Sequence, residues 1–172
     1  MTGVMKKLYI IRHAKSSWDD PNLRDHDRPL NARGERDKVI MARFVKANFT
    51  DIEMLYTSTA MRALDYAVAI HIHSGLKLEV DETLYTFDSR TLLRFFLSLP
   101  ERYSSVGIVS HNPAVTEIIN HLAQLDEKQK ITNLPTSAIA VIECDVQKWS
   151  ELAANSGTVV DFARPKFLTK NA

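Results

Sequence analysis

Three apolar runs of the sequence are followed by residues that could bind or attack a phosphoryl group. Arginine and histidine follow the run 8–11, serine and then arginine follow the run 53–57, and histidine follows the run 105–110. The residues concerned are Arg12, His13, Ser58, Arg62 and His111. Guanidinium groups offer paired N–H donors to phosphoryl oxygens, and an unprotonated imidazole is a nucleophile. These residue types therefore indicate phosphoryl chemistry.

The order of the predicted elements explains how these residues could meet. Apolar runs predict strands at 8–11, 53–57, 76–80, 105–110, 137–146 and 158–163, and helical spacing predicts helices at 32–48, from about 58, near 89–99 and from 113. The alternation indicates an α/β fold, a three-layer α/β/α sandwich with a mostly parallel central sheet. Because the carboxyl ends of parallel strands share one edge, the two arginines and two histidines are expected to converge there.

Two helices and one loop frame this edge. Residues 14–30 are polar and aperiodic, which predicts a long loop, and Asn31 is the expected N-cap of the helix that follows. Ser58 or Thr59 is the expected cap of the next helix. We expect its inward face to consist of Met61, Leu64, Val68 and His71.

The composition is ordinary for a globular protein and excludes several classes of partner. The sequence has 22 Lys+Arg against 21 Asp+Glu, and the resulting charge of +1 predicts no binding to nucleic acid. No signal peptide or membrane helix is expected, because no apolar run approaches about 18 residues. The single cysteine, Cys144, fits a reducing compartment, and the cytoplasm is the expected location. The length predicts one domain over residues 1–172, with a surface tail from about residue 165.

Five segments resemble the histidine phosphatase superfamily, which has the phosphoglycerate-mutase-like fold. They are "IIRHAKSSW", "DRPLNARGERD", "STAMRAL", "VGIVSHNPAV" and "LPTSAIAVIE", and they occur in the family's order between residue 8 and about residue 143. Ala14 stands where the family often has glycine. The second and fifth segments are similar to those of the SixA-type phosphohistidine phosphatase branch.

The resemblance implies a role for each residue of the cluster. His13 would attack phosphorus and form a phosphohistidine intermediate, which water then hydrolyses. Arg12 and Arg62 would bind the nonbridging oxygens, and His111 would donate a hydrogen bond to the phosphoryl group. Physical chemistry agrees, because neighbouring guanidinium groups lower the pKa of a histidine and keep it nucleophilic.

Two further residues are candidate substrate contacts. They are Ser58 and Arg28, and for Arg28 an ion pair with Asp27 that fixes the long loop is an equal alternative. Positioning and charge stabilisation are sufficient for phosphoryl transfer, so no metal and no other cofactor is expected. His71 and His73 are two apart on a predicted helix, so they point in different directions and cannot share one metal ion.

The sequence leaves the source of a proton for the leaving group open. Larger relatives carry a glutamate in a Leu-x-Glu context, and here Thr86 stands at that position. Glu82 or Asp88 could replace it. Alternatively no acid is needed, because the imidazole of a phosphohistidine substrate leaves as a neutral ring. The short chain also has little length for a cap over the site, which suits a side chain presented by another protein.

These observations predict a metal-independent phosphatase that acts through a phosphohistidine intermediate and dephosphorylates protein phosphohistidine. A small-molecule phosphomonoesterase of the same superfamily and a non-catalytic phosphate-binding module remain as alternatives, because fold does not establish chemistry. The oligomeric state and any closure of the loop 14–30 are left open.

Overall fold

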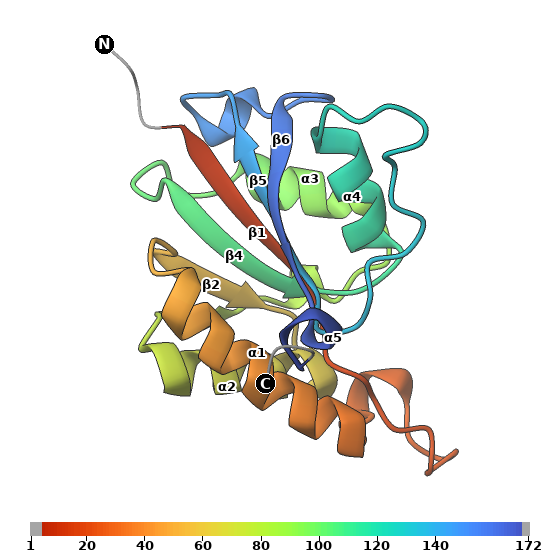
Figure 1. The fold of residues 1–172 in the computed structure, drawn as a ribbon. Helices are drawn as coiled ribbons and strands as arrows, with labels where there is room; N and C mark the ends of the chain where they lie inside the picture. The colour runs from red at the N-terminus through yellow and green to blue at the C-terminus, as the bar shows by residue number, and fades with distance from the viewer. Residues whose placement is uncertain (1–4, 170–172) are drawn as a thin grey trace.

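A six-stranded sheet forms the centre of the computed structural model, which describes residues 5–169 (Figure 1). The strands are β1 (Lys6–Arg12), β2 (Met54–Thr57), β3 (Leu78–Val80), β4 (Ser105–Ser110), β5 (Ile139–Cys144) and β6 (Gly157–Ala163), in the spatial order β3-β2-β4-β1-β5-β6. The first four in this order are parallel. β5 runs antiparallel to β1, and β6 runs antiparallel to β5. The sheet is therefore mostly parallel, as the alternation of elements predicts.

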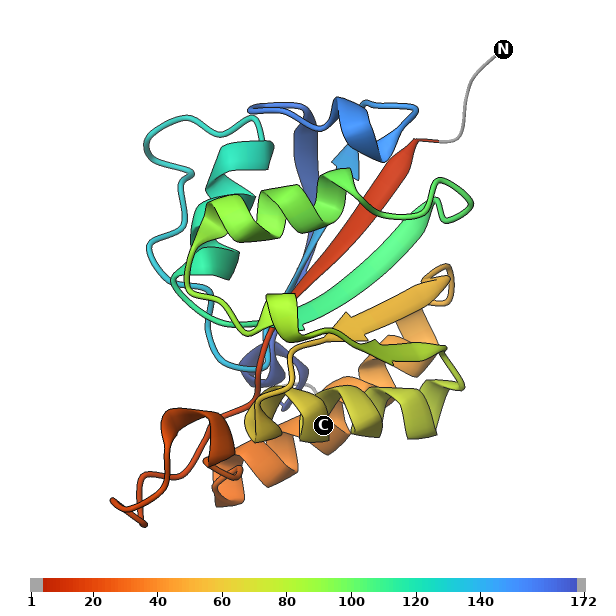
Figure 2. The ribbon, with the colours of Figure 1, turned by 180° about the vertical axis from the view of Figure 1, so that it is seen from behind.

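Helices cover both faces of the sheet and complete three layers. The helices are α1 (Ala32–Asn48), α2 (Met61–Ser74), α3 (Ser89–Leu97), α4 (Ala114–Leu122) and α5 (Pro165–Leu168), with short 3-10 helices η1 (Asp25–Asp27), η2 (Glu82–Leu84) and η3 (Trp149–Glu151). α1 and α2 lie on one face, and α3 and α4 lie on the other (Figure 2). This is the three-layer α/β/α sandwich that the sequence predicts. None of the helices within residues 5–169 combines the length and apolarity needed to cross a membrane.

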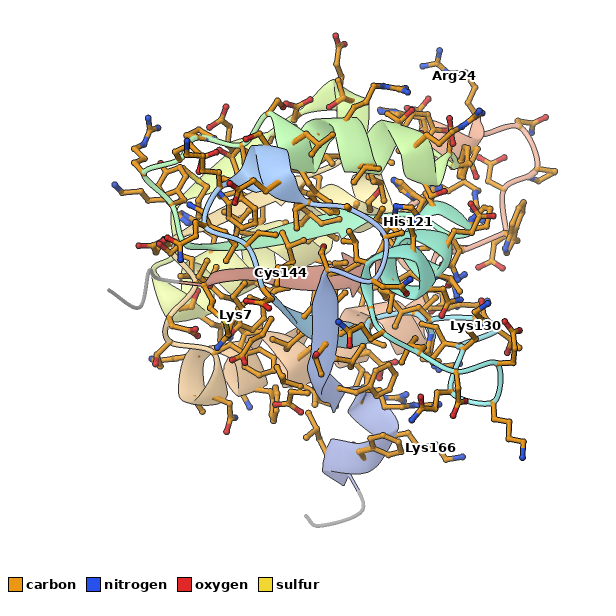
Figure 3. All side chains as sticks on the ribbon, turned by 90° about the horizontal axis from the view of Figure 1, so that it is seen from above. Lys7, Arg24, His121, Lys130, Cys144 and Lys166 are labelled. Carbon is orange, nitrogen blue, oxygen red and sulfur yellow. The ribbon has the colours of Figure 1, made fainter. Side chains whose placement is uncertain are left out.

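β1 is buried on both faces because it lies between two separate apolar clusters. Leu8 and Ile10 belong to the cluster under α3 and α4, whereas Tyr9 and Ile11 belong to the cluster under α1 and α2. A strand that is covered on both faces has a nearly continuous apolar sequence, and this accounts for the run that precedes Arg12. Cys144 in β5 is also fully buried (Figure 3), and burial raises the pKa of its thiol to about 12.

The predicted cap and inward face of α2 are wrong. The helix begins after Ala60, whose side chain makes no capping hydrogen bond, rather than after Ser58 or Thr59. Its buried residues are Arg62, Ala63, Tyr66, Ala67, Ala69 and Ile70. Met61 and His71 are exposed instead. Small alanines line the face toward the sheet, so the larger apolar residues do not mark the inward direction in this helix.

The predicted surface tail contains a short helix within the described residues. Pro165 is buried and begins α5, where its fixed φ suits the first turn of a helix. Leu168 packs against the apolar cluster that includes α1 residues Met41 and Val45. The chain therefore docks on the α1 side of the sheet at least as far as Leu168.

The long loop after β1 is closed at its base by contacts with α1. Asn31 caps α1 as predicted, accepting a hydrogen bond from the Gly34 amide at 2.8 Å. The Asn31 amide donates to the carbonyl oxygen of Lys15 at 3.0 Å. Ser16 bridges to Leu30 across the loop. The two ends of the loop 14–30 therefore lie against each other where β1 ends and α1 begins.

We predict that Gly34→Ala destabilises the protein by about 1–3 kcal/mol, the usual cost of overpacking. A Cβ atom at position 34 would collide with the Lys15 carbonyl group, which is backbone and cannot move aside alone. Chemical denaturation measures the effect. Arg43→Ala on the exposed face of the same helix is the control and should change the free energy of unfolding by less than about 0.5 kcal/mol. Equal stability of the two variants would contradict the close approach.

Candidate functional site

The pairing of β1 with β4 places the two histidines side by side. Arg12 is the register partner of Ser110, so His13 and His111 follow at neighbouring strand ends. The His13 amide donates to the Ser110 carbonyl oxygen at 3.1 Å. The two imidazole centroids are 5.1 Å apart, with 42° between the ring planes. The sheet therefore brings together residues that are almost a hundred positions apart in the chain.

A backbone carbonyl group fixes the tautomer of His13. Its Nδ1 lies 2.7 Å from the carbonyl oxygen of Ala14, so Nδ1 carries the proton and Nε2 keeps its lone pair. Burial is the largest cause that lowers the pKa of His13 to about 3; the Ala14 hydrogen bond opposes the shift, and the charges of Arg62 and Arg12 add to it. The imidazole is neutral at physiological pH. The direction predicted from neighbouring guanidinium groups is confirmed, although burial outweighs them.

His111 is fully buried and bonded at both ring nitrogens. Arg62 donates from Nη2 to Nδ1 at 3.3 Å, so the proton sits on Nε2, which donates to Ser58 Oγ at 2.7 Å. Burial is the largest cause that lowers its pKa to about 2, and the nearby His13 and Arg62 act in the same direction. The structure therefore places Ser58 against His111 and keeps that ring neutral.

Arg62 is 2% exposed and is held by the loop that follows β1. Its Nη1 donates to the Asp25 carbonyl oxygen at 2.6 Å, and its Nη2 donates to Asp25 Oδ2 at 2.9 Å. Asp25 also forms an ion pair with Arg28, whose Nη2 donates to Oδ1 at 2.9 Å. The Tyr85 hydroxyl group donates to Asp25 Oδ2 at 2.8 Å. One carboxylate therefore joins the loop, α2 and the segment after η2.

The same contacts include an ion pair of Arg28 within the loop, with Asp25 as its partner. Arg28 pairs with Asp25 and not with Asp27, which instead pairs with Arg24 at the periphery of the molecule (Figure 3). Its guanidinium group also stacks on the exposed ring of Trp18, 3.5 Å from the ring centroid. Arg28 is 7% exposed and contributes to the lowered pKa of His13, so it belongs to the cluster.

Arg12 reaches the cluster from the end of β1. Its Nη1 donates to the carbonyl oxygen of Leu134 at 2.8 Å and to Asn133 Oδ1 at 3.3 Å. Burial lowers its pKa, and the like charge of Arg62 acts in the same direction. The Nε atoms of Arg12, Arg28 and Arg62 are buried and have no hydrogen-bond acceptor within residues 5–169. Three unsatisfied N–H donors on three neighbouring cations are the type of group that binds an oxyanion.

Neither carboxyl group suggested as a proton donor is bonded to the histidines. Asp88 caps α3, accepting from the Arg90 amide at 3.0 Å, and this bond together with the Arg90 side chain lowers its pKa. Glu82 is exposed on η2. The carboxyl group that does enter the cluster is Asp25. Partial burial acts to raise its pKa, but hydrogen bonds from Tyr85 and Arg62 and the Arg62 charge lower it to about 2.

Comparison with known proteins identifies the family. A model described as histidine phosphatase superfamily (branch 1) matches residues 8–89. The uncharacterized protein ML1117 of Mycobacterium leprae is 32% identical over 166 residues, which cover 91% of this chain and 100% of that protein. This chain belongs to the histidine phosphatase superfamily. As a member of that superfamily it is a phosphatase, and phosphorylated molecules are its substrates.

Solved structures place this histidine phosphatase with SixA-type proteins. The structure of a SixA-type protein from Agrobacterium tumefaciens has a TM-score of 0.78 and 25% identity, covering 93% of this chain and 98% of that one. The protein histidine phosphatase SixA complexed with tungstate has a TM-score of 0.77 and 25% identity, covering 94% of this chain and 99% of that chain.

Residues 5–169 contain no group of three or more His, Cys, Asp or Glu side chains that could hold a metal ion.

Sequence reasoning missed several residues that build this site in the phosphatase. They are Asp25, Tyr85, Asn133 and Ser137. Ser137 has a positive φ of 64° and donates its amide to the carbonyl oxygens of Arg12 and His13, at 3.2 and 3.0 Å. The Thr-Ser-Ala segment that includes Ser137 was a signal for this position. A lone aspartate in a polar loop gave no comparable signal for Asp25.

We predict that His13 stays neutral, as the Nδ1–H tautomer, from pH 8 down to pH 5. Its pKa of about 3 lies below the ordinary value of 6.5, so protonation is delayed to more acidic solution. Long-range ¹H–¹⁵N spectra of protein labelled with ¹⁵N-histidine report the tautomer directly, and His13→Gln assigns the signals. An inflection of the His13 signals near pH 6.5 would refute this protonation state.

We predict that Asp25→Asn makes stability less dependent on pH in acid. The folded pKa of about 2 lies below the ordinary value of 3.8 for an aspartate, so the ionised carboxylate stabilises the folded state above about pH 4. This contribution disappears as pH falls toward 2. Because the side chain is 42% exposed, solvent screening limits the effect to about 1 kcal/mol. Urea denaturation should show the wild type and the variant converging between pH 4 and pH 2. Curves that stay parallel would contradict the prediction.

Proposed function

We propose that this histidine phosphatase hydrolyses the phosphorus–nitrogen bond of phosphohistidine on a protein partner. The observation that carries the proposal is that Asp25 and Asp88, the carboxyl groups near the site, are already held by other partners. Asp25 is ionised with a pKa of about 2, and Asp88 is engaged as a helix cap. An alkoxide leaving group needs a proton from the enzyme. An imidazole with a proton on its other nitrogen leaves as a neutral molecule and needs none.

The proposed reaction has two steps with His13 as the nucleophile. Nε2 of His13 attacks phosphorus as the bond from phosphorus to the substrate imidazole breaks, which leaves a phosphoryl group on His13 and a neutral imidazole. Water then attacks phosphorus, and His13 leaves as inorganic phosphate forms. The tautomer held by Ala14 supports this role, because it keeps the Nε2 lone pair free.

The cations are proposed to hold the phosphoryl oxygens through both steps. Arg12 and Arg62 each have a buried Nε–H without an acceptor, and a phosphoryl oxygen would supply one. Arg28 adds a third such group. His111 is proposed to donate its Nε2–H to a phosphoryl oxygen, which then competes with Ser58 Oγ for this proton. We also propose a cytoplasmic location, because the one cysteine is a buried free thiol.

The substrate preference is measured by comparing rates of phosphate release. A phosphohistidine-bearing protein should be hydrolysed with a higher kcat/KM than a panel of sugar and nucleotide monophosphates. Faster hydrolysis of the esters would favour the small-molecule phosphomonoesterase instead. Binding of phosphate without turnover of either class would favour a phosphate-binding module.

We predict that His13→Ala lowers kcat at least about 10³-fold, because the nucleophile is lost. Tungstate binding should weaken by less than about 10-fold, because the guanidinium groups remain. His121→Ala, which removes an exposed histidine of α4 (Figure 3), is the matched control and should keep full activity. A ³²P label that is stable in alkali and labile in acid should appear on wild-type protein and not on His13→Ala. An active and labelled His13→Ala enzyme would remove the nucleophile assignment.

A further inference from the structure

We propose that Tyr85 and Phe87 form an aromatic wall that receives the departing imidazole, and that Phe87 makes the enzyme selective for aromatic leaving groups. This inference rests on the proposed function. The two residues flank Thr86, which stands where larger relatives carry their acid. The wall would recognise the ring that leaves, whereas the acid of those relatives protonates the oxygen that leaves.

The wall contacts one member of the histidine pair, His111. The ring of Tyr85 meets His111 edge-on, with centroids 5.3 Å apart and 83° between the planes. The ring of Phe87 lies 5.8 Å from His111 and 5.7 Å from Tyr85. All three separations are within the range of favourable aromatic pairs. Phe87 is therefore connected to the reaction centre by ring contacts.

Tyr85 is fixed at both ends, and this makes the wall rigid. Its hydroxyl donates to Asp25 Oδ2 at 2.8 Å, and its ring contacts the ring of His26, with centroids 4.9 Å apart and 85° between the planes. His26 is itself bonded through Nε2 to Thr59 Oγ1 at 2.9 Å. A ring that is held in this way can orient a ligand with little loss of side-chain freedom.

Phe87 differs from the residues around it because its ring is open to solvent. It is 49% exposed, whereas His13 is 7% and His111 is 0% exposed. A phenylalanine left half exposed next to a buried charged cluster gains little from that position in the free protein. Its exposed surface is available to a ligand that enters the site.

The direction of the reaction places the leaving group on this outer side. Attacking and leaving atoms lie roughly in line through phosphorus. His13 is 7% exposed, so we place it at the inner end of this line and the leaving group at the outer end, toward the exposed Phe87. Phe87 is the exposed ring that contacts His111, and a planar imidazole leaving there can pair with it. An alkyl leaving group has no π surface and gains no such contact.

Trp18 is the other exposed aromatic residue near the cluster, and it differs from Phe87 in its contacts. It is 72% exposed and its ring lies on the Arg28 guanidinium group rather than on a histidine. Phe167 in α5 is 52% exposed and lies against Phe162, with centroids 6.3 Å apart. Trp18 is therefore a control near the cluster, and Phe167 is a control with nearly the same exposed fraction as Phe87.

The test compares two substrates that share a phosphorus–nitrogen bond. Free phosphohistidine releases an aromatic ring, and phosphoramidate releases ammonia. For Phe87→Ala and Phe87→Leu, kcat/KM for phosphohistidine should fall about 3- to 10-fold, the loss expected for one aromatic pair, with less than about 2-fold change for phosphoramidate. Phe87→Tyr should restore the wild-type ratio. Phe167→Ala should change neither value, and Trp18→Ala should lower both values or neither.

The outcomes separate the wall from the proposed function. If Phe87→Ala and Phe87→Leu change kcat/KM equally for the two substrates, or leave kcat/KM for phosphohistidine unchanged, the role of the aromatic wall is refuted. The proposed function would then still stand. A wild-type enzyme that hydrolyses phosphate esters faster than phosphohistidine would overturn the function and the imidazole assignment together. Because Phe87→Leu keeps an apolar side chain, it shows whether a loss comes from the missing ring rather than from a disturbed fold.

Discussion

The burial of three guanidinium groups beside two imidazoles is the constraint on which the site depends. Removing positive charges from water is costly unless hydrogen bonds and an opposite charge compensate them. Asp25 supplies that charge to Arg28 and Arg62, and carbonyl oxygens supply acceptors to Arg12 and Arg62. The histidines are neutral mainly because burial lowers the pKa of both rings, and the positive charges of Arg62 and Arg12 act in the same direction. In its neutral form His111 also accepts a hydrogen bond from Arg62 through Nδ1.

Because Asp25 pairs with the buried arginines, the loop after β1 is part of the site. Asp25 belongs to the loop, and Arg62 would be a buried unpaired cation without it. The loop can supply Asp25 only if its base is fixed. The contacts of Asn31 and Gly34 with Lys15 fix it, and the pair of His26 with Thr59 ties its tip to the segment before α2. Gly34 in α1 therefore helps to position Asp25, and Asp25 compensates the charge of Arg62.

The sequence predicted the parts of the site that follow from local patterns. Arg12, His13 and His111 stand directly after apolar strands, and strand order then brings them together. The partners of the arginines depend on contacts between distant segments, and no local pattern marks them. Asp25 pairs with Arg62 across 37 positions and with Tyr85 across 60, and Arg12 reaches Asn133 across 121. The inward face of α2 was missed for another reason, because alanine carries a weak hydrophobic signal and still packs closely against the sheet.

The antiparallel pairing of β5 explains how the nucleophile is held from its other side. In a fully parallel sheet the neighbour of β1 would end at the same edge, and both strands would leave together. β5 runs in the opposite direction, so the segment that enters it passes the end of β1. The Ser137 amide can then donate to the carbonyl oxygens of Arg12 and His13, and Tyr66 anchors Ser137 by donating to its carbonyl oxygen at 3.0 Å. The backbone of His13 is therefore fixed by β4 on one side and by the entry to β5 on the other, and its ring is held by the Ala14 carbonyl oxygen and packs on His111.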